Sequence, residues 1–214
     1  MSMKEILQEI KCWNENRNNP GVISSLMSGI MSIQFSPGKK LLQGDDLHVY
    51  PAIQDNGKDQ ILKFYLISAT YDTSNQLKQP DGLIPYIDEA SILWNLADID
   101  KDKIPADTAK ARIYAWEHDF SSWLNISASH AKVFQAFHIP KKDLGYETIH
   151  AYFGLVPYTD EIAGDVFRAD LVINPTDRGI GSIFEDTVMP VPPFGVNGAL
   201  ANSHFFLLNH ALGK

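Results

Sequence analysis

The sequence lacks most of the features that would assign the chain to a chemical class. Its single cysteine, Cys12, excludes an internal disulfide framework and favours a reducing compartment such as the cytoplasm. It has no Lys/Arg-rich run: the net charge is −8, and the densest basic features are the doublets Lys39-Lys40 and Lys141-Lys142. Because nucleic acid binding depends on many phosphate contacts, we predict no nucleic acid partner.

Long hydrophobic runs are missing as well. The N-terminal stretch MSMKEILQEIK carries charges every few residues and has no apolar core of the kind found in signal peptides. The most apolar early run, residues 21–35, is interrupted by serines and a glutamine. This run is too short and too polar to span a bilayer. We therefore expect a cytoplasmic protein without a membrane partner.

Motifs for catalysis and cofactor binding are also absent. The sequence has no HExxH zinc motif, no GxSxG nucleophile motif, and no GxGxxG or GxxxxGK[ST] phosphate loop. The segment from Arg178 to Gly181, RGIG, is too short to replace such a loop. We therefore predict neither a metal ion nor a cofactor. The composition, with 44% hydrophobic and 21% charged residues, is that of a globular protein with an ordinary core.

What the sequence does contain is an internal repeat. Residues 35–53, FSPGKKLLQGDDLHVYPAI, recur 102 positions later as residues 137–155, FHIPKKDLGYETIHAYFGL. The identities at this offset are Phe35, Lys39, Lys40, Leu42, His48 and Tyr50 with Phe137, Lys141, Lys142, Leu144, His150 and Tyr152. Average composition would give roughly one identity by chance in such a window. The sequence therefore predicts a duplication, with repeat 1 at residues 1–102 and repeat 2 at residues 103–214.

Weaker matches extend the repeat on both sides of this window. Ile10 and Trp13 match Ile113 and Trp116 at an offset of 103, and Leu93, Asn95 and Ala97 match Leu207, Asn209 and Ala211 at an offset of 114. The second copy therefore gains about 12 residues, which we place in the Gly- and Pro-rich segment 178–198. Each half is predicted to be a helix–(strand)–β-hairpin–helix unit.

Hydrophobic periodicity and turn residues give the expected elements. We predict helices at residues 4–16, 86–97, from 107 onwards and 199–211, and hairpin strands at 47–53, 61–71, 148–156 and 165–174. Residues 22–35 fit either a helical turn or a strand. The predicted fold class is α+β, with mainly antiparallel sheet, helices to one side and a pseudo-two-fold axis between the repeats. We expect the repeats to pack as one globular unit.

Two His/Tyr pairs stand out because the repeat conserves their spacing. His48 and Tyr50 share one face of a predicted strand, and His150 and Tyr152 share the equivalent face in the second half. One interpretation places both pairs around a groove on the pseudo-two-fold axis, where they bind an anion or relay a proton. The other interpretation is that both pairs are structural residues whose rings cover the sheet.

Three further candidates lie where the two copies differ. Glu117-His118-Asp119 joins a histidine to two carboxylates, although adjacent helical residues point in different directions and cannot all bind one ion. Arg168 and Asp170 share a strand face, where they could hold a charged ligand or form a surface ion pair. Phe194, in the Pro-rich segment, fits a lid, a partner contact or ordinary packing.

Two functional hypotheses follow from these observations. The first is a non-catalytic binding or assembly module, whose ligand or protein partner binds mainly to the second repeat through His118, His150, Tyr152, Arg168, Asp170 and Phe194. The second is a small-molecule enzyme that uses His150 or His118 as an acid–base group. The lack of a recognisable nucleophile, metal set or cofactor loop favours the first hypothesis, and a concave pocket with convergent catalytic groups would favour the second.

Overall fold

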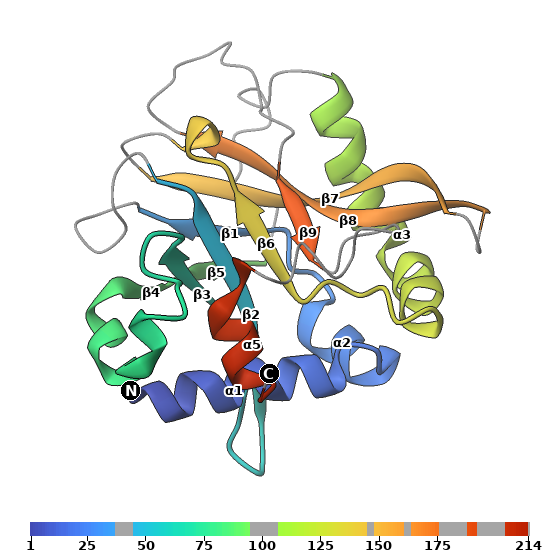
Figure 1. The fold of residues 1–214 in the computed structure, drawn as a ribbon. Coiled ribbons are helices and arrows are strands. Elements are labelled where there is room, and N and C mark those ends of the chain that lie inside the picture. The colour runs from blue at the N-terminus through green and yellow to red at the C-terminus, as the bar shows by residue number, and fades with distance from the viewer. Residues whose placement is uncertain are drawn as a thin grey trace.

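The chain folds into two antiparallel β-sheets with helices packed on them (Figure 1). A computed structural model describes residues 1–36, 45–94, 107–144, 148–160, 164–175, 188–191 and 204–213. All strand pairs in this part of the chain are antiparallel. The predicted α+β class with antiparallel sheet is therefore confirmed.

Each sheet combines a hairpin from one half of the chain with short strands from the other half. Sheet A has the order β5-β1-β7-β8, and sheet B has the order β4-β3-β2-β6-β9. The strands of sheet A are β5 (Ser91–Leu93), β1 (Ser32–Phe35), β7 (Ile149–Asp160) and β8 (Gly164–Pro175). Those of sheet B are β4 (Ile87–Glu89), β3 (Gln60–Ser68), β2 (Leu47–Asp55), β6 (Ala136–Ile139) and β9 (Met189–Val191). The two predicted hairpins correspond to β2–β3 and β7–β8.

The first half begins with two helices whose starting points follow from the sequence. In α1 (Met3–Asn16), the Ser2 hydroxyl accepts a hydrogen bond from the Glu5 backbone N–H, and the Glu5 carboxylate accepts one from the Ser2 backbone N–H. This capping box starts the predicted helix at residues 4–16. In α2 (Pro20–Met27), Pro20 stands at the first helical position, where its missing N–H costs nothing. The segment 22–35 thus contains both a helix and a strand.

The helices cover different sheets. The face of β2 that carries Tyr50 and Ala52 packs against α1. The long helix α3 (Asp107–Ser129), predicted from residue 107 onwards, packs on β7 and β8 and crosses β7 at Gly154. The expectation of helices to one side is therefore wrong, because there are two sheets and each hairpin needs its own apolar cover.

The main hydrophobic core lies between the two sheets. Neighbouring residues of a strand point to opposite faces, so Phe153 of β7 faces sheet B where Gly154 faces α3. Its ring centroid lies 5.7 Å from that of Phe64 in β3 and 6.3 Å from that of Phe137 in β6. A second cluster lies between sheet B, α1 and the C-terminal helix α5 (Phe206–Ala211).

The predicted helix at residues 86–97 is wrong. Two 3₁₀ segments, η1 (Gln76–Lys78) and η2 (Pro80–Tyr86), precede the short strands β4 and β5. Between these strands the Ala90 backbone N–H donates to the Phe64 carbonyl at 3.0 Å, so Ala90 is tied to β3. The described part of the terminal helix starts at Phe206, and residues 95–97 and 199–203 lie outside the described residues. No helix in the described ranges is both long and apolar enough to cross a bilayer.

Two tryptophans connect the halves by reciprocal hydrogen bonds. The Trp13 indole N–H, from α1, donates to the Phe134 carbonyl at 3.0 Å, just before β6. The Trp116 indole N–H, from α3, donates to the Ile30 carbonyl at 2.8 Å, just before β1. Each long helix therefore fixes the entry to a short strand that belongs to the other half of the chain.

Candidate functional site

A small hollow lies between α3 and residues 28–31, the connection from α2 to β1. Its volume is about 220 Å³. The connection turns at Gly29, whose φ of +84° is a conformation that glycine adopts without steric cost. The Met31 backbone N–H then bonds the Leu93 carbonyl at 3.0 Å, which sets the end of β5 beside the hollow. The hollow is lined by Ser28, Gly29, Ile30, Met31, Trp94, Trp116, Glu117, His118, Phe120 and Ser121.

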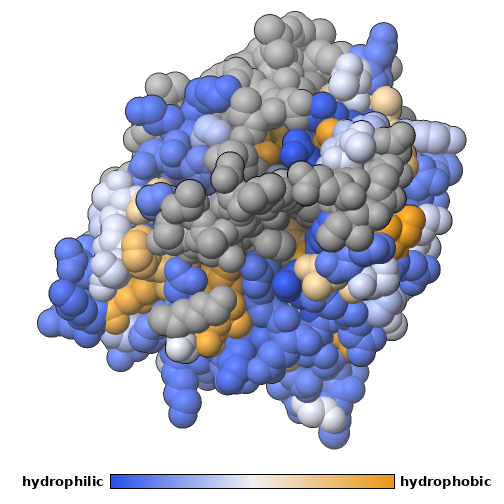
Figure 2. Space-filling model, turned by 45° about the vertical axis from the view of Figure 1, so that its right-hand side comes forward, coloured by the Kyte–Doolittle hydropathy of each residue, from blue (hydrophilic) through white to orange (hydrophobic). Residues whose placement is uncertain are grey.

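The rim of this hollow carries an unusual exposed aromatic residue. Trp94 directly follows β5, and 52% of its surface is exposed, whereas Trp13, Trp116 and Trp123 are at most 2% exposed. The floor is apolar, since Ile30 and Met31 are buried. In the view of Figure 2, hydrophilic residues cover most of the described surface, and hydrophobic residues form separate patches.

The predicted site residue His118 lies at this hollow together with Glu117. The His118 Nδ1 is 2.9 Å from the Tyr114 carbonyl and 4.0 Å from the Glu117 carboxylate, and both side chains are about half exposed. The His118 ring also stacks on Tyr114 at a centroid distance of 3.8 Å. The arrangement offers an imidazole, a carboxylate and aromatic surface, all accessible to a ligand.

The other predicted candidates on described residues share one face of sheet A but do not converge on one point. In the β7–β8 ladder His150 faces Asn174, Gly154 faces Asp170, and Val156 faces Arg168, so these residues are spread along the hairpin. Asp170 is buried and pairs with Arg112 of α3 at 3.4 Å, which gives it a structural role. The structure thus separates Asp170 from the histidines.

The immediate surroundings of His150 and Tyr152 are those of partly buried sheet residues. Burial lowers the pKa of His150, and its Nδ1 has no hydrogen-bond partner in the described part of the chain. Burial raises the pKa of Tyr152, and a hydrogen bond with Asn174 opposes that shift. The same holds for the Nε of Arg168, which bonds to no atom of the described residues. Phe194 lies outside the described residues.

Sequence reasoning singled out His48 and Tyr50 but missed the carboxylate, Asp72, that joins them in a buried polar cluster on sheet B. Asp72, which is 1% exposed, accepts hydrogen bonds from His48 Nδ1 at 2.6 Å, from the Tyr50 hydroxyl and from the Leu207 backbone N–H at 2.8 Å. Burial, and then the Asp72 charge, raise the pKa of Tyr50. The Phe205 ring stacks on His48 at 4.2 Å. A His–Asp pair could serve acid–base catalysis, but here it is covered by the segment that it anchors.

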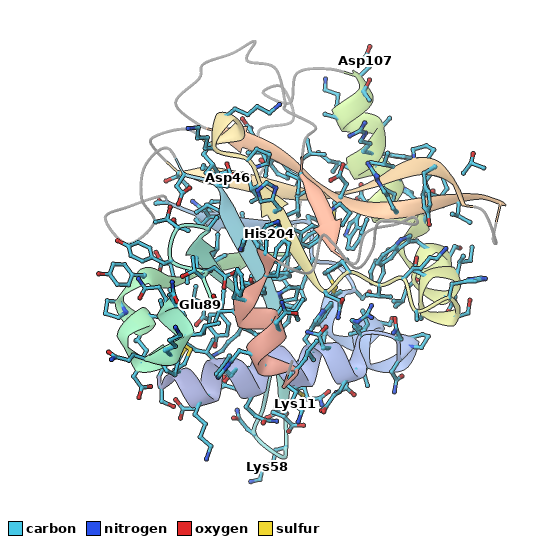
Figure 3. All side chains as sticks on the ribbon, viewed as in Figure 1. Lys11, Asp46, Lys58, Glu89, Asp107 and His204 are labelled. Carbon is cyan, nitrogen blue, oxygen red and sulfur yellow. The ribbon has the colours of Figure 1, made fainter. Side chains whose placement is uncertain are left out.

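A second imidazole, His138 of β6, lies beside this cluster. Its Nε2 is 3.1 Å from the Asp46 carboxylate, and its ring centroid is 5.7 Å from that of His48. Figure 3 shows Asp46 near the start of β2 and His204 near the start of α5. Burial lowers the pKa of His138, Asp46 opposes this shift, and His48 and His204 add to it. Asp72 and His138 had no motif or periodicity that could have marked them.

The described residues contain no group of three or more His, Cys, Asp or Glu side chains placed to hold a metal ion. No family model, no curated protein and no solved structure matches the chain. The function must therefore be argued from the geometry of the candidate sites themselves.

Proposed function

We propose that the chain is a non-catalytic binding module, built by duplication, whose ligand or protein partner binds at the hollow beside α3. The observation that carries this proposal is Trp94, a half-exposed tryptophan that shares a hollow with the accessible Glu117 and His118. Two of the three residues come from the second half, as the sequence hypothesis expects. A cytoplasmic location and the lack of a nucleic acid partner stay part of the proposal, because they rest on composition alone.

The strand order supports the duplication. From its hairpin outwards, sheet A has β8, β7, β1 and β5, and sheet B has β3, β2, β6 and β9, with β4 added at its edge. In both sheets a hairpin from one half is followed by two short strands from the other. The reciprocal bonds of Trp13 and Trp116 repeat this exchange.

Each long helix forms an ion pair with a hairpin of its own half, which supports the duplication further. In α1 the helix residue is the anion, whereas in α3 it is the cation. Glu9 of α1 lies 3.7 Å from Lys63, and Lys63 faces Ala52 across the β2–β3 ladder. Arg112 of α3 lies 3.4 Å from Asp170, and Asp170 faces Gly154 across the β7–β8 ladder. In both halves, a charged residue of the long helix thus pairs with an oppositely charged residue of the hairpin, and that hairpin residue lies opposite a small residue on the neighbouring strand. A pair that exchanges both signs keeps its attraction.

These contacts revise two parts of the sequence alignment. Phe167, which the offset of 103 matches with Phe64, is 38% exposed, whereas Phe64 is fully buried. The pairing of the strands instead places Asp170 at the position of Lys63. The longer second hairpin accounts for this shift from the sequence alignment. The match of Leu93 with Leu207 is also wrong, because Leu93 ends a strand and Leu207 lies in a helix.

The surroundings of the histidines favour binding over the alternative of an enzyme that uses His150 or His118. A histidine general base is most effective when one ring nitrogen is free and the other bonds a carboxylate, which orients the ring and stabilises the imidazolium. At His118 the Nδ1 lies 2.9 Å from the Tyr114 carbonyl, which can orient the ring but carries no charge, and the Glu117 carboxylate is 4.0 Å away. The Nδ1 of His150 has no hydrogen-bond partner among the described residues. Within that part of the chain, neither ring is paired with a carboxylate as closely as His48 is with Asp72.

A ligand screen tests the proposal. Small amines, sugars, nucleotides and unstructured peptides are added to the full chain, and binding is followed by thermal shift and by ¹⁵N–¹H spectra. We expect a ligand to move the indole signal of Trp94 and to lose affinity in His118→Ala. The matched control is Glu15→Ala, at the position of His118 in the first helix. Binding that instead perturbs His48 and Tyr50, or turnover that requires His150, would contradict the proposal.

A further inference from the structure

We infer that the hollow beside α3 binds an organic cation, a methylated ammonium or a guanidinium head group. This inference rests on the proposed function and adds the chemical class of the ligand. Three properties of the hollow lead to it: its charge, its aromatic rim and its size.

The charge of the hollow is negative. Glu117 carries the only carboxylate among the described lining residues, and neither lysine nor arginine is among them. Its side chain is 44% exposed, so a ligand can reach it without first breaking a buried pair. The chain as a whole carries a net charge of −8, which also attracts cations to its surface. An anionic ligand would meet repulsion here.

The second property is the aromatic rim, which is formed by the half-exposed Trp94. A cation above an aromatic face is attracted by the ring quadrupole, and tryptophan gives the strongest such contact. Tyr114, which stacks against His118, is 62% exposed and lies next to the rim. Trp94 and the Glu117 carboxylate line the same hollow, so a cation bound there could use both an aromatic ring and a counter-charge.

The size of the hollow limits the ligand to a head group. Pockets for whole drug-sized ligands have volumes of roughly 300–1,000 Å³, whereas this hollow has about 220 Å³. Its apolar floor, Ile30 and Met31, suits methyl groups better than a strongly hydrated primary ammonium. The head group could belong to a free small amine or to a modified lysine or an arginine on a partner protein.

The experiment separates charge from shape. Choline and its uncharged isostere 3,3-dimethyl-1-butanol are titrated into ¹⁵N-labelled full-length protein, and the four tryptophan indole signals are followed after assignment by Trp→Phe variants. A trimethyllysine peptide and an arginine peptide form the second arm. We expect the cationic probes, and not the alcohol, to move the Trp94 signal, and we expect added salt to weaken the effect.

Two matched variants test the carboxylate. Glu117→Gln keeps the shape of the side chain and removes its charge, and we expect it to weaken cation binding by about threefold or more, as for a charge at an exposed site. Glu15→Gln changes an exposed carboxylate on α1 and should bind like the wild type. Circular dichroism confirms that both variants are folded.

Each result decides between defined alternatives. If the peptides bind and choline does not, the inference is supported and the cation belongs to a partner protein. If both bind, the inference is supported and the cationic head group alone is sufficient for binding. Equal shifts with choline and the alcohol, or an unchanged affinity in Glu117→Gln, would overturn the inference. If a neutral ligand from the screen binds at Trp94 and the cations do not, the proposed binding function is supported and the inference of a cationic ligand is wrong. If no ligand perturbs Trp94, both proposals fail.

Discussion

Gly154 is a residue at which α3 packs closely on sheet A. A Cβ at this position would lie 3.1 Å from Arg112 Cβ and 3.4 Å from Val172 Cγ2. We expect Gly154→Ala to lower the free energy of unfolding by about 1–3 kcal/mol, because overpacking displaces the helix. Gly82→Ala, where nothing lies within 4 Å, is the control and should stay within about 0.5 kcal/mol. Urea denaturation measures both, and equal effects would mean that α3 does not approach β7 as described.

Two partly buried histidines make the stability of the fold depend on pH. Burial lowers the pKa of His138 and of His150 below 6.5, so the unfolded chain binds protons more readily than the folded chain. Acidification therefore favours unfolding. The loss of stability begins as the pH falls through about 6.5 and ends below the folded-state pKa values.

The prediction concerns the difference in free energy of unfolding between pH 7 and pH 5. We expect the double variant His138→Gln, His150→Gln to lose less stability over this range than the wild type. His130→Gln, at an exposed position after α3, is the control and should behave as the wild type. If the double variant keeps the full pH dependence, the burial of these two rings is not its cause.

At the scale of elements, the C-terminal helix α5 depends on a carboxylate far away in the sequence. Its first residues have no side-chain cap, and the Leu207 backbone N–H donates to Asp72, 135 residues earlier. Asp72→Asn keeps the shape but places an amide N–H against the donors. We expect a loss of about 3 kcal/mol and faster hydrogen exchange in Phe206–Ala211 than elsewhere.

The matched control for this prediction is Asp81→Asn. Asp81 is an exposed carboxylate on η2, and it lines the same shallow hollow as His210 and Ala211 of α5. It should leave both stability and exchange unchanged within about 0.5 kcal/mol. Exchange in Asp72→Asn that rises equally in α1 and α5 would show that the carboxylate does not anchor α5 specifically.

The elements differ in how far the sequence predicts them. The helices α1 and α3 and both hairpins are long enough for periods of 3.6 and 2 to be distinguished, and a capping box marks the start of α1. The stripe Ile87, Ala90 and Trp94 predicts a helix, but the segment forms two three-residue strands, β4 and β5, that are too short to show a period. Their position depends on a bond from Ala90 to distant Phe64, which local patterns cannot reveal.

The candidate site was predictable only in part, for the same reason. The difference between the repeats identified His118 and Glu117, whereas Trp94 was hidden by its assignment to the apolar stripe of a helix. Trp94 reaches the hollow because Met31 bonds to Leu93 across sheet A. Asp72 is a single carboxylate in a loop, and its role depends on partners 24 and 135 residues away. Contacts of this range leave no signal in one sequence.

At the scale of the whole molecule, neither half can complete a sheet alone. Residues 1–102 contain β4 and the hairpin β2–β3, but β6, which pairs with β2, and β9, which pairs with β6, belong to the second half. The carbonyl that accepts the Trp13 indole N–H also belongs to the second half. We therefore expect fragments 1–102 and 103–214 to be unfolded separately and to recover dispersed amide signals when mixed.

The control for the fragment experiment is the full chain cleaved between residues 102 and 103 after folding, which should keep its spectrum. A fragment 1–102 that folds alone, with a sharp cooperative transition, would contradict the mutual dependence of the halves. It would also weaken the proposal of an exchanged duplication.

The crossed strands also have a consequence for the order of events during synthesis. A nascent chain leaves the ribosome from its N-terminus at about 5–20 residues per second, and β2 must wait for β6 before sheet B can close. During that interval the apolar face with Val49 and Phe64, which the finished protein buries completely, has no permanent cover. Contacts this distant in sequence also fold slowly, because loop closure costs entropy before it is rewarded. We therefore expect the first half to keep this apolar face uncovered for seconds, until the second half folds onto it.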